Sequence, residues 1–163
     1  MATVTLGLGS NLGDRLLQLS RAREALGQTL DHIRCSPIYE TAPWGVKEQP
    51  QFLNAVCQGM TKLDPASLLR LLKQIEQRLG RVASRPWGPR AIDLDLLFYD
   101  DRLLDSPTLT VPHPLLHERA FVLVPLADLA PTLVHPRTGT TIAELRSGVD
   151  ISDVKLAPVQ WTA

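Results

Sequence analysis

Apolar residues recur along the chain with two different spacings, and each spacing predicts one type of element. In residues 93–99 they alternate with polar residues near the start, which is typical of a strand with one buried face. At spacings of three and four they run through residues 14–26 and 64–80, which predicts two amphipathic helices. Shorter apolar runs predict strands over 4–10, 33–41 and 52–60 and a further helix over 120–129.

End signals support the two long helices. Asp64 is a suitable N-cap for the second, Pro65 fits its first helical position, and Gly80 can end it. Gly27 can end the first helix in the same way. Both helices are therefore expected to stop within a residue or two of these positions.

The predicted order of elements is strand, helix, strand, strand, helix, strand. This is the split βαβ pattern of an α+β fold, and we expect a ferredoxin-like βαββαβ sandwich. Extra short elements follow it at the C-terminal end: a short edge strand at 108–111, the helix at 120–129 and at most one further short helix. We expect a single domain over residues 1–163, with a linker-like tail from about Gly148.

Composition limits the classes of function. The chain has 17 Lys and Arg against 17 Asp and Glu, so no basic excess points to nucleic acid or to an anionic membrane. It has no apolar run of about 18 residues and no basic-then-apolar N-terminus, so we expect a cytoplasmic protein without a membrane partner. Cys35 and Cys57 lie in predicted strands without a Cys-x-x-Cys spacing, and we expect both to be unpaired, buried thiols in a reducing compartment.

Candidate chemistry is concentrated in residues 85–97. Asp93 and Asp95 are two apart on the predicted strand, so their carboxylates project from one face, about 6–7 Å apart at their bases. Two carboxylates at that spacing suit a hard cation or a pair of cations, and Arg90 adds donors suited to phosphate. The alternative is a solvated strand edge, which is disfavoured because Asp is rare in strands.

A known family carries the same motif. Trp87-Gly88-Pro89-Arg90 followed by Asp93-Leu94-Asp95-Leu96-Leu97 resembles the signature of the 6-hydroxymethyl-7,8-dihydropterin pyrophosphokinases of the folate pathway. Gly9-Ser10-Asn11 and Val111-Pro112-His113 match further family motifs. The resemblance implies transfer of the ATP diphosphate to the hydroxymethyl group of 6-hydroxymethyl-7,8-dihydropterin, with release of AMP and with two Mg²⁺ ions as cofactors.

The same resemblance implies three sets of site residues. Asp93 and Asp95 would be the metal ligands and, with Arg81 and Arg90, the catalytic residues. The ATP-binding positions would be Glu76, Arg85, Trp87, Arg90, Leu96, Thr110, His113 and Arg119. The pterin-binding positions would be Thr41, Pro43, Trp44, Phe52, Asn54 and Phe121.

Several of these residues also have plain structural interpretations. Phe52 and Asn54 could stack on a flat heterocycle and pair with its edge, or they could be a core aromatic and a sheet amide. The resemblance favours the first interpretation, although many family members have Tyr where Phe52 stands. Pro86 and Thr108 also replace charged residues of other members, which leaves open which arginine meets the nucleotide.

Other assignments fit the sequence less well. His113 and His117 are four apart, as in half of a zinc site, but no His or Cys cluster completes it, and His117 is expected on the surface. A metal-dependent nucleotidyl cyclase or phosphohydrolase would also use paired aspartates on such a sheet. A regulatory or RNA-binding module is disfavoured by the neutral charge and by the lack of an RNA-binding aromatic motif. We expect a monomer whose partners are ATP and the pterin, with lid-like loops at 42–51 and 81–90.

Overall fold

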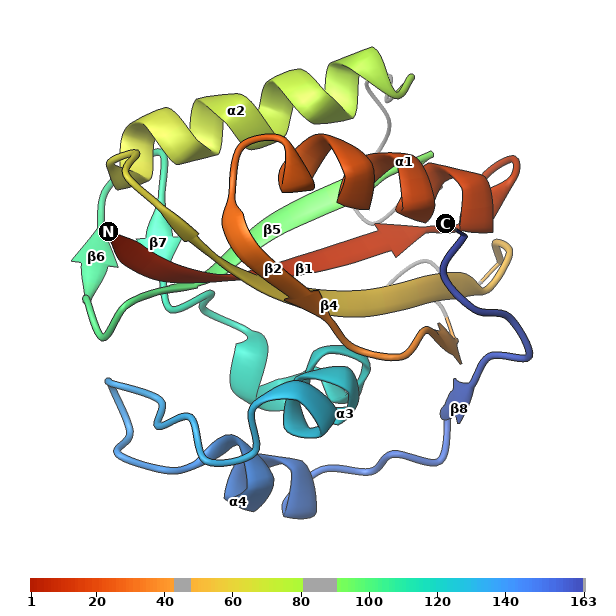
Figure 1. Ribbon diagram of the computed structural model, residues 1–163. Helices are drawn as coiled ribbons and strands as arrows, with labels where there is room; N and C mark the ends of the chain where they lie inside the picture. Colours follow the sequence, from red (N-terminus) through yellow and green to blue (C-terminus); the bar gives the residue numbers. More distant parts are fainter. Residues whose placement is uncertain (43–47, 81–90, 163) are drawn as a thin grey trace.

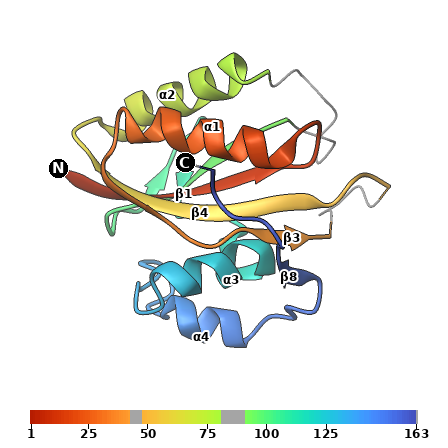
Figure 2. The same cartoon turned by 45° about the vertical axis from the view of Figure 1, so that its right-hand side comes forward.

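The structure of the protein is a computed structural model that describes residues 1–42, 48–80 and 91–162. Within these residues, a main sheet lies between two layers of helices (Figures 1 and 2). The strands of the main sheet are β1 (Ala2–Ser10), β2 (Asp31–Cys35), β3 (Tyr39–Thr41), β4 (Phe52–Thr61), β5 (Asp93–Tyr99) and β8 (Val154–Leu156).

The order of the strands is β5-β1-β4-β3-β8, and β2 also pairs with β4. All of these pairings are antiparallel. The strands that follow one another in the chain therefore do not all lie side by side, because β1 is inserted between β4 and β5. This is the strand arrangement of a βαββαβ sandwich, so the predicted ferredoxin-like α+β fold is confirmed.

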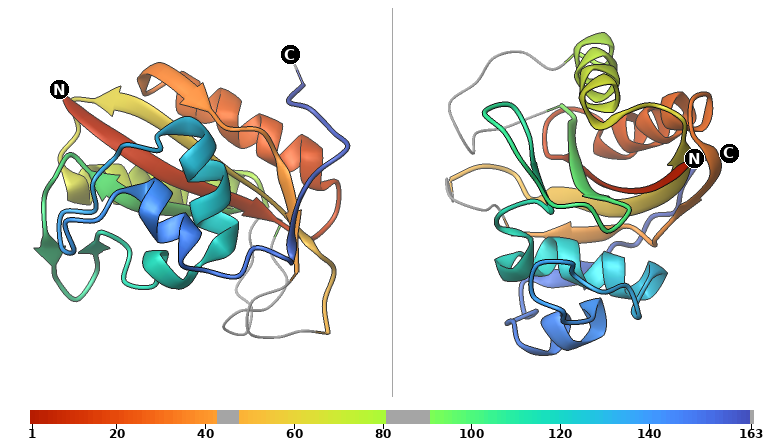
Figure 3. Two further views of the ribbon diagram at one scale, coloured as in Figure 1. Left: turned by 90° about the horizontal axis from the view of Figure 1, so that it is seen from below. Right: turned by 90° about the vertical axis from the view of Figure 1, so that its left-hand side faces the viewer.

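Helices cover both faces of the sheet, as the end-on view of Figure 3 shows. On one face lie α1 (Arg15–Gly27) and α2 (Pro65–Arg78), and on the other lies α3 (Ala120–Leu129), with α4 (Ile142–Ser147) packed against the outer side of α3. The side chain of Asp14 caps α1 by accepting from Leu17 N at 3.1 Å. The predicted boundaries of α1, α2 and α3 hold to within two residues.

A separate apolar core fills each side of the sheet. Leu19 and Leu26 of α1 and Leu72 of α2 pack against Leu6 and Leu8 of β1, and all five side chains are buried. On the other side the buried residues are Val56, Leu97, Phe98, Leu116, Val122, Leu123, Leu126 and Ile142. Both faces of the central strands are therefore covered. A polar side chain buried in this sheet is unusual and indicates a hydrogen-bonding or functional role.

A small hairpin leads from the sheet to the helix layer of α3. It consists of β6 (Leu104–Asp105) and β7 (Thr110–Val111), so the predicted edge strand at 108–111 is confirmed in its second half. The 3₁₀-helix η1 (Leu116–Glu118) follows it and ends directly before α3. His117 on η1 is exposed, as predicted.

The prediction of one strand over residues 33–41 is wrong. β2 and β3 are separate, and the break falls at Ser36 and Pro37. Pro37 has no N–H for the ladder. The Ser36 hydroxyl takes the place of a backbone acceptor and receives the Val56 N–H at 3.0 Å. The chain is thereby redirected while both pieces remain paired with β4.

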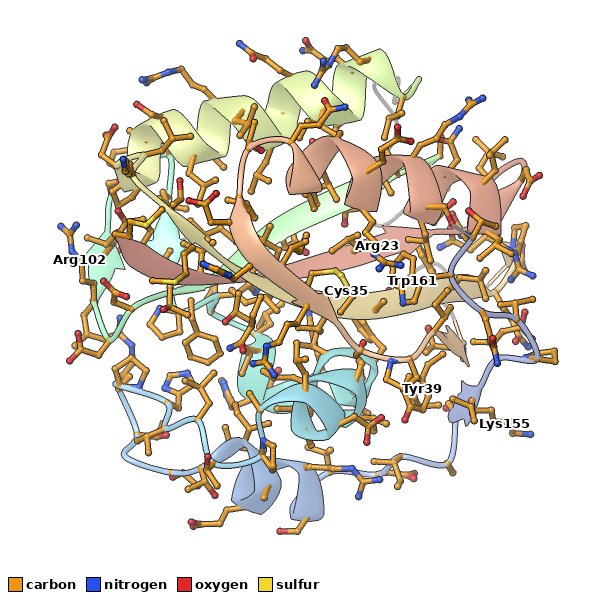
Figure 4. The ribbon with its side chains drawn as sticks, in the orientation of Figure 1. Arg23, Cys35, Tyr39, Arg102, Lys155 and Trp161 are labelled. Atoms are coloured by element: carbon orange, nitrogen blue, oxygen red, sulfur yellow. A yellow bond between two sulfur atoms is a disulfide. The ribbon has the colours of Figure 1, made fainter. Side chains whose placement is uncertain are left out.

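The prediction of two unpaired thiols is also wrong. Cys35 of β2 and Cys57 of β4 are direct partners in the strand register, with Cα atoms 4.1 Å apart, and their sulfur atoms form a disulfide. Figure 4 shows the sulfur of Cys35 at the crossing of the two strands. The residues are 22 apart in sequence, so only the fold reveals that they are adjacent.

The segment from Gly148 onward is not the loose tail that the sequence predicts. β8 adds to the sheet beside β3, and Ala157 N donates to Ile38 O at 2.9 Å. Trp161 packs beneath the Arg23 guanidinium and donates its indole N–H to Ser36 O at 2.9 Å (Figure 4).

Within the described part of the chain, none of the helices combines the length and apolar character needed to span a membrane.

Candidate active site

The paired aspartates lie on the face of the sheet that α3 covers. On β5, Leu94 and Leu96 point into the core beneath α1 and α2, whereas Asp93 and Asp95 point to the opposite side. Both aspartates are half-buried. The predicted alternation of this strand is therefore confirmed, and the two carboxylates share one face.

Glycines lie next to both aspartates on the neighbouring strand. Gly9 of β1 is in register with Asp93, and Gly7 is in register with Asp95. On its other side Gly9 is in register with Asn54 of β4. Because directly opposed residues share a face of the sheet, the row from Asp93 to Asn54 has no side chain in its middle.

Asn54, Thr41 and Phe52 form the far end of this row. Asn54 Nδ2 donates to Thr41 Oγ1 at 2.6 Å, and both residues are buried. Thr41 is in register with Phe52, so the three side chains stand on one face where β3 and β4 meet. A methyl group on Gly9 would lie 2.8 Å from Asn54 Oδ1 and 3.5 Å from the Phe52 ring. The amide and the aromatic ring thus lie beside Gly9. We call Gly7 and Gly9, which share this face of β1, the glycine strip.

Arg119 and Phe121 reach the same face from the start of α3. The Arg119 side chain is 5% exposed, and its Nη1 lies 3.9 Å from Asp95 Oδ2. Its guanidinium carbon lies 5.5 Å from the centre of the Phe121 ring. The arginine therefore places one cationic group beside Asp95 and within cation–π distance of the Phe121 ring.

His113 lies between β7 and η1 and faces the same charges. Its backbone N–H donates to Leu97 O at 3.1 Å, which attaches it to β5. Burial, helped by the positive charge of Arg119 and opposed by Asp93, lowers the pKa of His113 to about 4. Its Nδ1 accepts the Leu115 N–H at 3.3 Å, so the neutral ring carries its proton on Nε2. His113 is therefore a neutral hydrogen-bond donor at pH 7.

Two predicted ATP-binding residues, Glu76 and Leu96, have side chains on the α2 side of the sheet rather than on the face with the aspartates. Glu76 of α2 is 4% exposed and accepts the Leu94 N–H at 2.8 Å. It therefore holds the outer edge of β5 between the two aspartates. The Leu96 side chain is buried in the core beneath α2, so only its backbone, on the same outer edge, is placed to meet a ligand.

The remaining predicted residues divide into two groups. Thr110 is half-buried on β7, two residues before Pro112. Six others lie outside the described residues, and their assignments remain predictions: Pro43, Trp44, Arg81, Arg85, Trp87 and Arg90. Most of the predicted loops at 42–51 and 81–90 also lies outside them.

The donor set near Asp93 and Asp95 fits Mg²⁺. Two carboxylates on one face, next to a strip without side chains, leave room for the waters and phosphate oxygens with which Mg²⁺ completes its shell. Among the described residues no group of three or more His, Cys, Asp or Glu side chains could hold a metal by itself. The arrangement suits a cation that arrives with a phosphate ligand.

Sequence reasoning misses two features of the site. From the sequence, Gly7 and Gly9 are assigned to a glycine-rich turn. In the structure both lie within β1 and share one face of the sheet, as their spacing of two residues allows. Arg15 is absent from the predicted site residues, yet its Nη1 donates to Glu40 Oε2 at 2.8 Å and to Gln51 O at 2.9 Å. No pattern in the sequence links these three residues.

Three comparisons relate the chain to known proteins. The family model described as 7,8-dihydro-6-hydroxymethylpterin-pyrophosphokinase matches residues 5–131. The 2-amino-4-hydroxy-6-hydroxymethyldihydropteridine pyrophosphokinase of Aquifex aeolicus is 43% identical over 136 residues, which cover 83% of this chain and 85% of that protein. The Methylorubrum extorquens protein of the same name is 43% identical over 157 residues, covering 95% and 98% of the two chains.

A solved structure shows the same fold. It is that of wild-type Plasmodium falciparum HPPK-DHPS with pteroate, which superposes with a TM-score of 0.75 at 19% identity. The match covers 90% of this chain and 42% of that one, so this chain corresponds to less than half of the larger protein.

Proposed function

The chain belongs to the 7,8-dihydro-6-hydroxymethylpterin-pyrophosphokinase family, and from this we propose how its residues divide the work of diphosphate transfer. The resemblance found in the sequence is thereby confirmed. The protein is an ATP-dependent diphosphotransferase of folate biosynthesis, with ATP as co-substrate and 6-hydroxymethyl-7,8-dihydropterin as acceptor. The roles of individual residues and the number of metal ions are our proposal.

The row from Asp93 across Gly9 to Asn54 is the observation that carries this proposal. Neighbouring strands are about 4.8 Å apart, so the backbones of Asp93 and Asn54 are separated by about 10 Å. That span is comparable with a bicyclic heterocycle and its hydroxymethyl arm. A pterin held at Asn54 would therefore direct its hydroxyl toward the aspartates over a strand without side chains.

Asp93 and Asp95 would hold two Mg²⁺ ions on the phosphate side of this row. When bound, Mg²⁺ neutralises triphosphate charge and holds the phosphates in a defined orientation. Arg119 adds a buried guanidinium 3.9 Å from Asp95, and His113 offers an Nε2–H without adding charge. The catalytic roles of Arg81 and Arg90 rest on the family motif alone.

Asn54 and Thr41 would recognise the polar edge of the pterin. Their mutual hydrogen bond fixes the orientation of the amide before the ligand arrives. Phe52 and Phe121 would cover the heterocycle, because aromatic pairs in stacked geometry add about 0.5–1.5 kcal/mol beyond area burial. Phe52 has no hydroxyl, so this position would contribute by packing only.

The transfer itself forms one bond and breaks one. The pterin hydroxymethyl oxygen attacks the β-phosphorus of ATP, the bond from that phosphorus to the α–β bridging oxygen breaks, and AMP leaves. The hydroxyl proton passes to solvent. Positioning and charge stabilisation carry most of the catalysis in such transfers, so no dedicated base is required.

A nucleotide assay tests this function against its rivals. Purified protein with Mg²⁺ and ATP should form AMP only when 6-hydroxymethyl-7,8-dihydropterin is added, one AMP for each pterin consumed. A cyclase or phosphohydrolase would instead consume ATP without the pterin. Pterin-independent release of pyrophosphate or phosphate would therefore replace our assignment with one of these.

We propose that the protein works as a monomeric single domain, 1–163. β8 joins the last part of the chain to the main sheet, which supports a single domain. Sedimentation velocity of the active enzyme is expected to give a single species near 18.0 kDa.

A further inference from the structure

Arg15 connects three segments that are distant in sequence. It is the first residue of α1, directly after the N-cap Asp14. One nitrogen of its guanidinium, Nη1, donates to Glu40 Oε2 at 2.8 Å and to Gln51 O at 2.9 Å. Glu40 lies on β3, and Gln51 directly precedes β4.

These two acceptors flank the pterin-side residues. Thr41 follows Glu40, and Phe52 follows Gln51, and the pair Thr41 and Phe52 is in register. Successive strand residues point to opposite faces. Glu40 therefore points to the α1 side of the sheet, behind the face on which Thr41 stands.

Asn11 holds the same region from the turn before α1. It is 1% exposed, and its Nδ2 donates to Gln49 Oε1 at 2.8 Å and to Pro50 O at 3.0 Å. Together, Asn11 and Arg15 bind three consecutive residues before β4, and Arg15 also binds β3. The start of α1 thus holds β3 and the residues that lead into β4.

We propose that Arg15 is a positioning residue for pterin binding, and that it acts by holding the adjoining ends of β3 and β4 from behind the site. Its two hydrogen bonds hold Glu40 and Gln51, and thereby the neighbouring Thr41 and Phe52. This inference rests on the proposed pterin role of Thr41, Phe52 and Asn54. Arg15 lies on the α1 side of the sheet, behind the face on which Thr41 and Phe52 stand, so its loss should weaken pterin binding and leave ATP affinity unchanged.

The test is a comparison of Arg15→Met with Arg21→Met. Both changes remove one arginine from α1, but Arg21 is exposed and lies outside the Arg15 contacts. For Arg15→Met we expect the pterin KM at saturating Mg²⁺ and ATP to rise about five- to tenfold, the size of effect expected for a partly exposed charge-assisted hydrogen bond. The Kd of a nonhydrolysable ATP analogue should stay within about twofold. Arg21→Met should change neither value.

Two further variants separate positioning from folding. Arg15→Lys keeps the charge and several donors, so it should recover most of the lost pterin affinity. Glu40→Gln keeps an acceptor but weakens its bond to Arg15. In the double variant it should add nothing to the effect of Arg15→Met, because that change already removes the Glu40 contact. These variants remain informative if Arg15→Met proves unstable.

Three results are distinguishable. An unchanged pterin KM in well-folded Arg15→Met overturns the inference. An equal loss for pterin and for the ATP analogue also overturns it, since this indicates a general defect of folding. Absence of pterin-dependent AMP formation in the unmodified enzyme would instead refute the proposed function.

Discussion

Substitution of Gly9 by Ala is the sharpest perturbation that the site offers. A Cβ atom at this position would lie 2.8 Å from Asn54 Oδ1, closer than real Cβ contacts, and 3.5 Å from the Phe52 ring. The Asn54 amide would have to turn away, and its hydrogen bond to Thr41 at 2.6 Å would be lost with it. One methyl group therefore removes the orientation of the pterin-side amide.

The expected effect can be estimated from that loss. A polar group of the bound pterin left without its partner costs about 1–3 kcal/mol, and tenfold in affinity corresponds to about 1.4 kcal/mol. The pterin KM should thus rise by roughly 5- to 150-fold. Affinity for a nonhydrolysable ATP analogue should be unchanged, because the aspartates and Arg119 stay in place.

Gly7→Ala is the matched control on the same strand and face. There a Cβ would meet Leu97 Cδ1 at 3.5 Å, which is an ordinary contact. Its pterin KM should stay within about twofold of the unmodified value, since no hydrogen bond moves. Pterin KM from initial rates of AMP formation, with thermal unfolding to confirm folding, provides the assay. Equal effects at Gly7 and Gly9, or none at Gly9, would refute the argument from the glycine strip.

Three other predictions concern metal binding, pH and stability. Asp95→Asn should fold normally but lose at least about a thousandfold in AMP formation even at saturating Mg²⁺, and near-normal rates there would exclude a metal role for Asp95. Burial lowers the pKa of His113 from 6.5 to about 4 in the folded protein. The unfolded chain therefore binds this proton first, and the free energy of unfolding should be constant above pH 6.5 and decrease as the pH falls toward 4. An NMR titration in which the ring protonates near pH 6.5 would contradict this prediction. Replacing Cys35 and Cys57 together by Ala should lower the free energy of unfolding by about 3.4 kcal/mol, from a closed loop of 22 residues, as urea unfolding of both proteins without reductant would measure.

Much of the fold follows from the sequence because its signals are local. Asp14 and Asp64 mark the starts of α1 and α2 through capping preferences that need only neighbouring residues. Alternation along β5 puts Asp93 and Asp95 on one face whatever lies around them. For the same reason the paired aspartates, the loop motif and the family resemblance can all be recognised from the order of residues alone.

What the tertiary structure alone decided depends on contacts between distant segments. The disulfide of Cys35 and Cys57 requires the register of β2 on β4, and the pairing of β8 with β3 leaves no sign in the short, exposed β8 segment itself. The break at Ser36 depends on a hydroxyl that meets Val56 across the sheet. The link from Arg15 to Glu40 likewise exists only after the start of α1 lies against β3. In each case the deciding interaction joins residues more than ten positions apart, where hydrophobic spacing and capping carry no information.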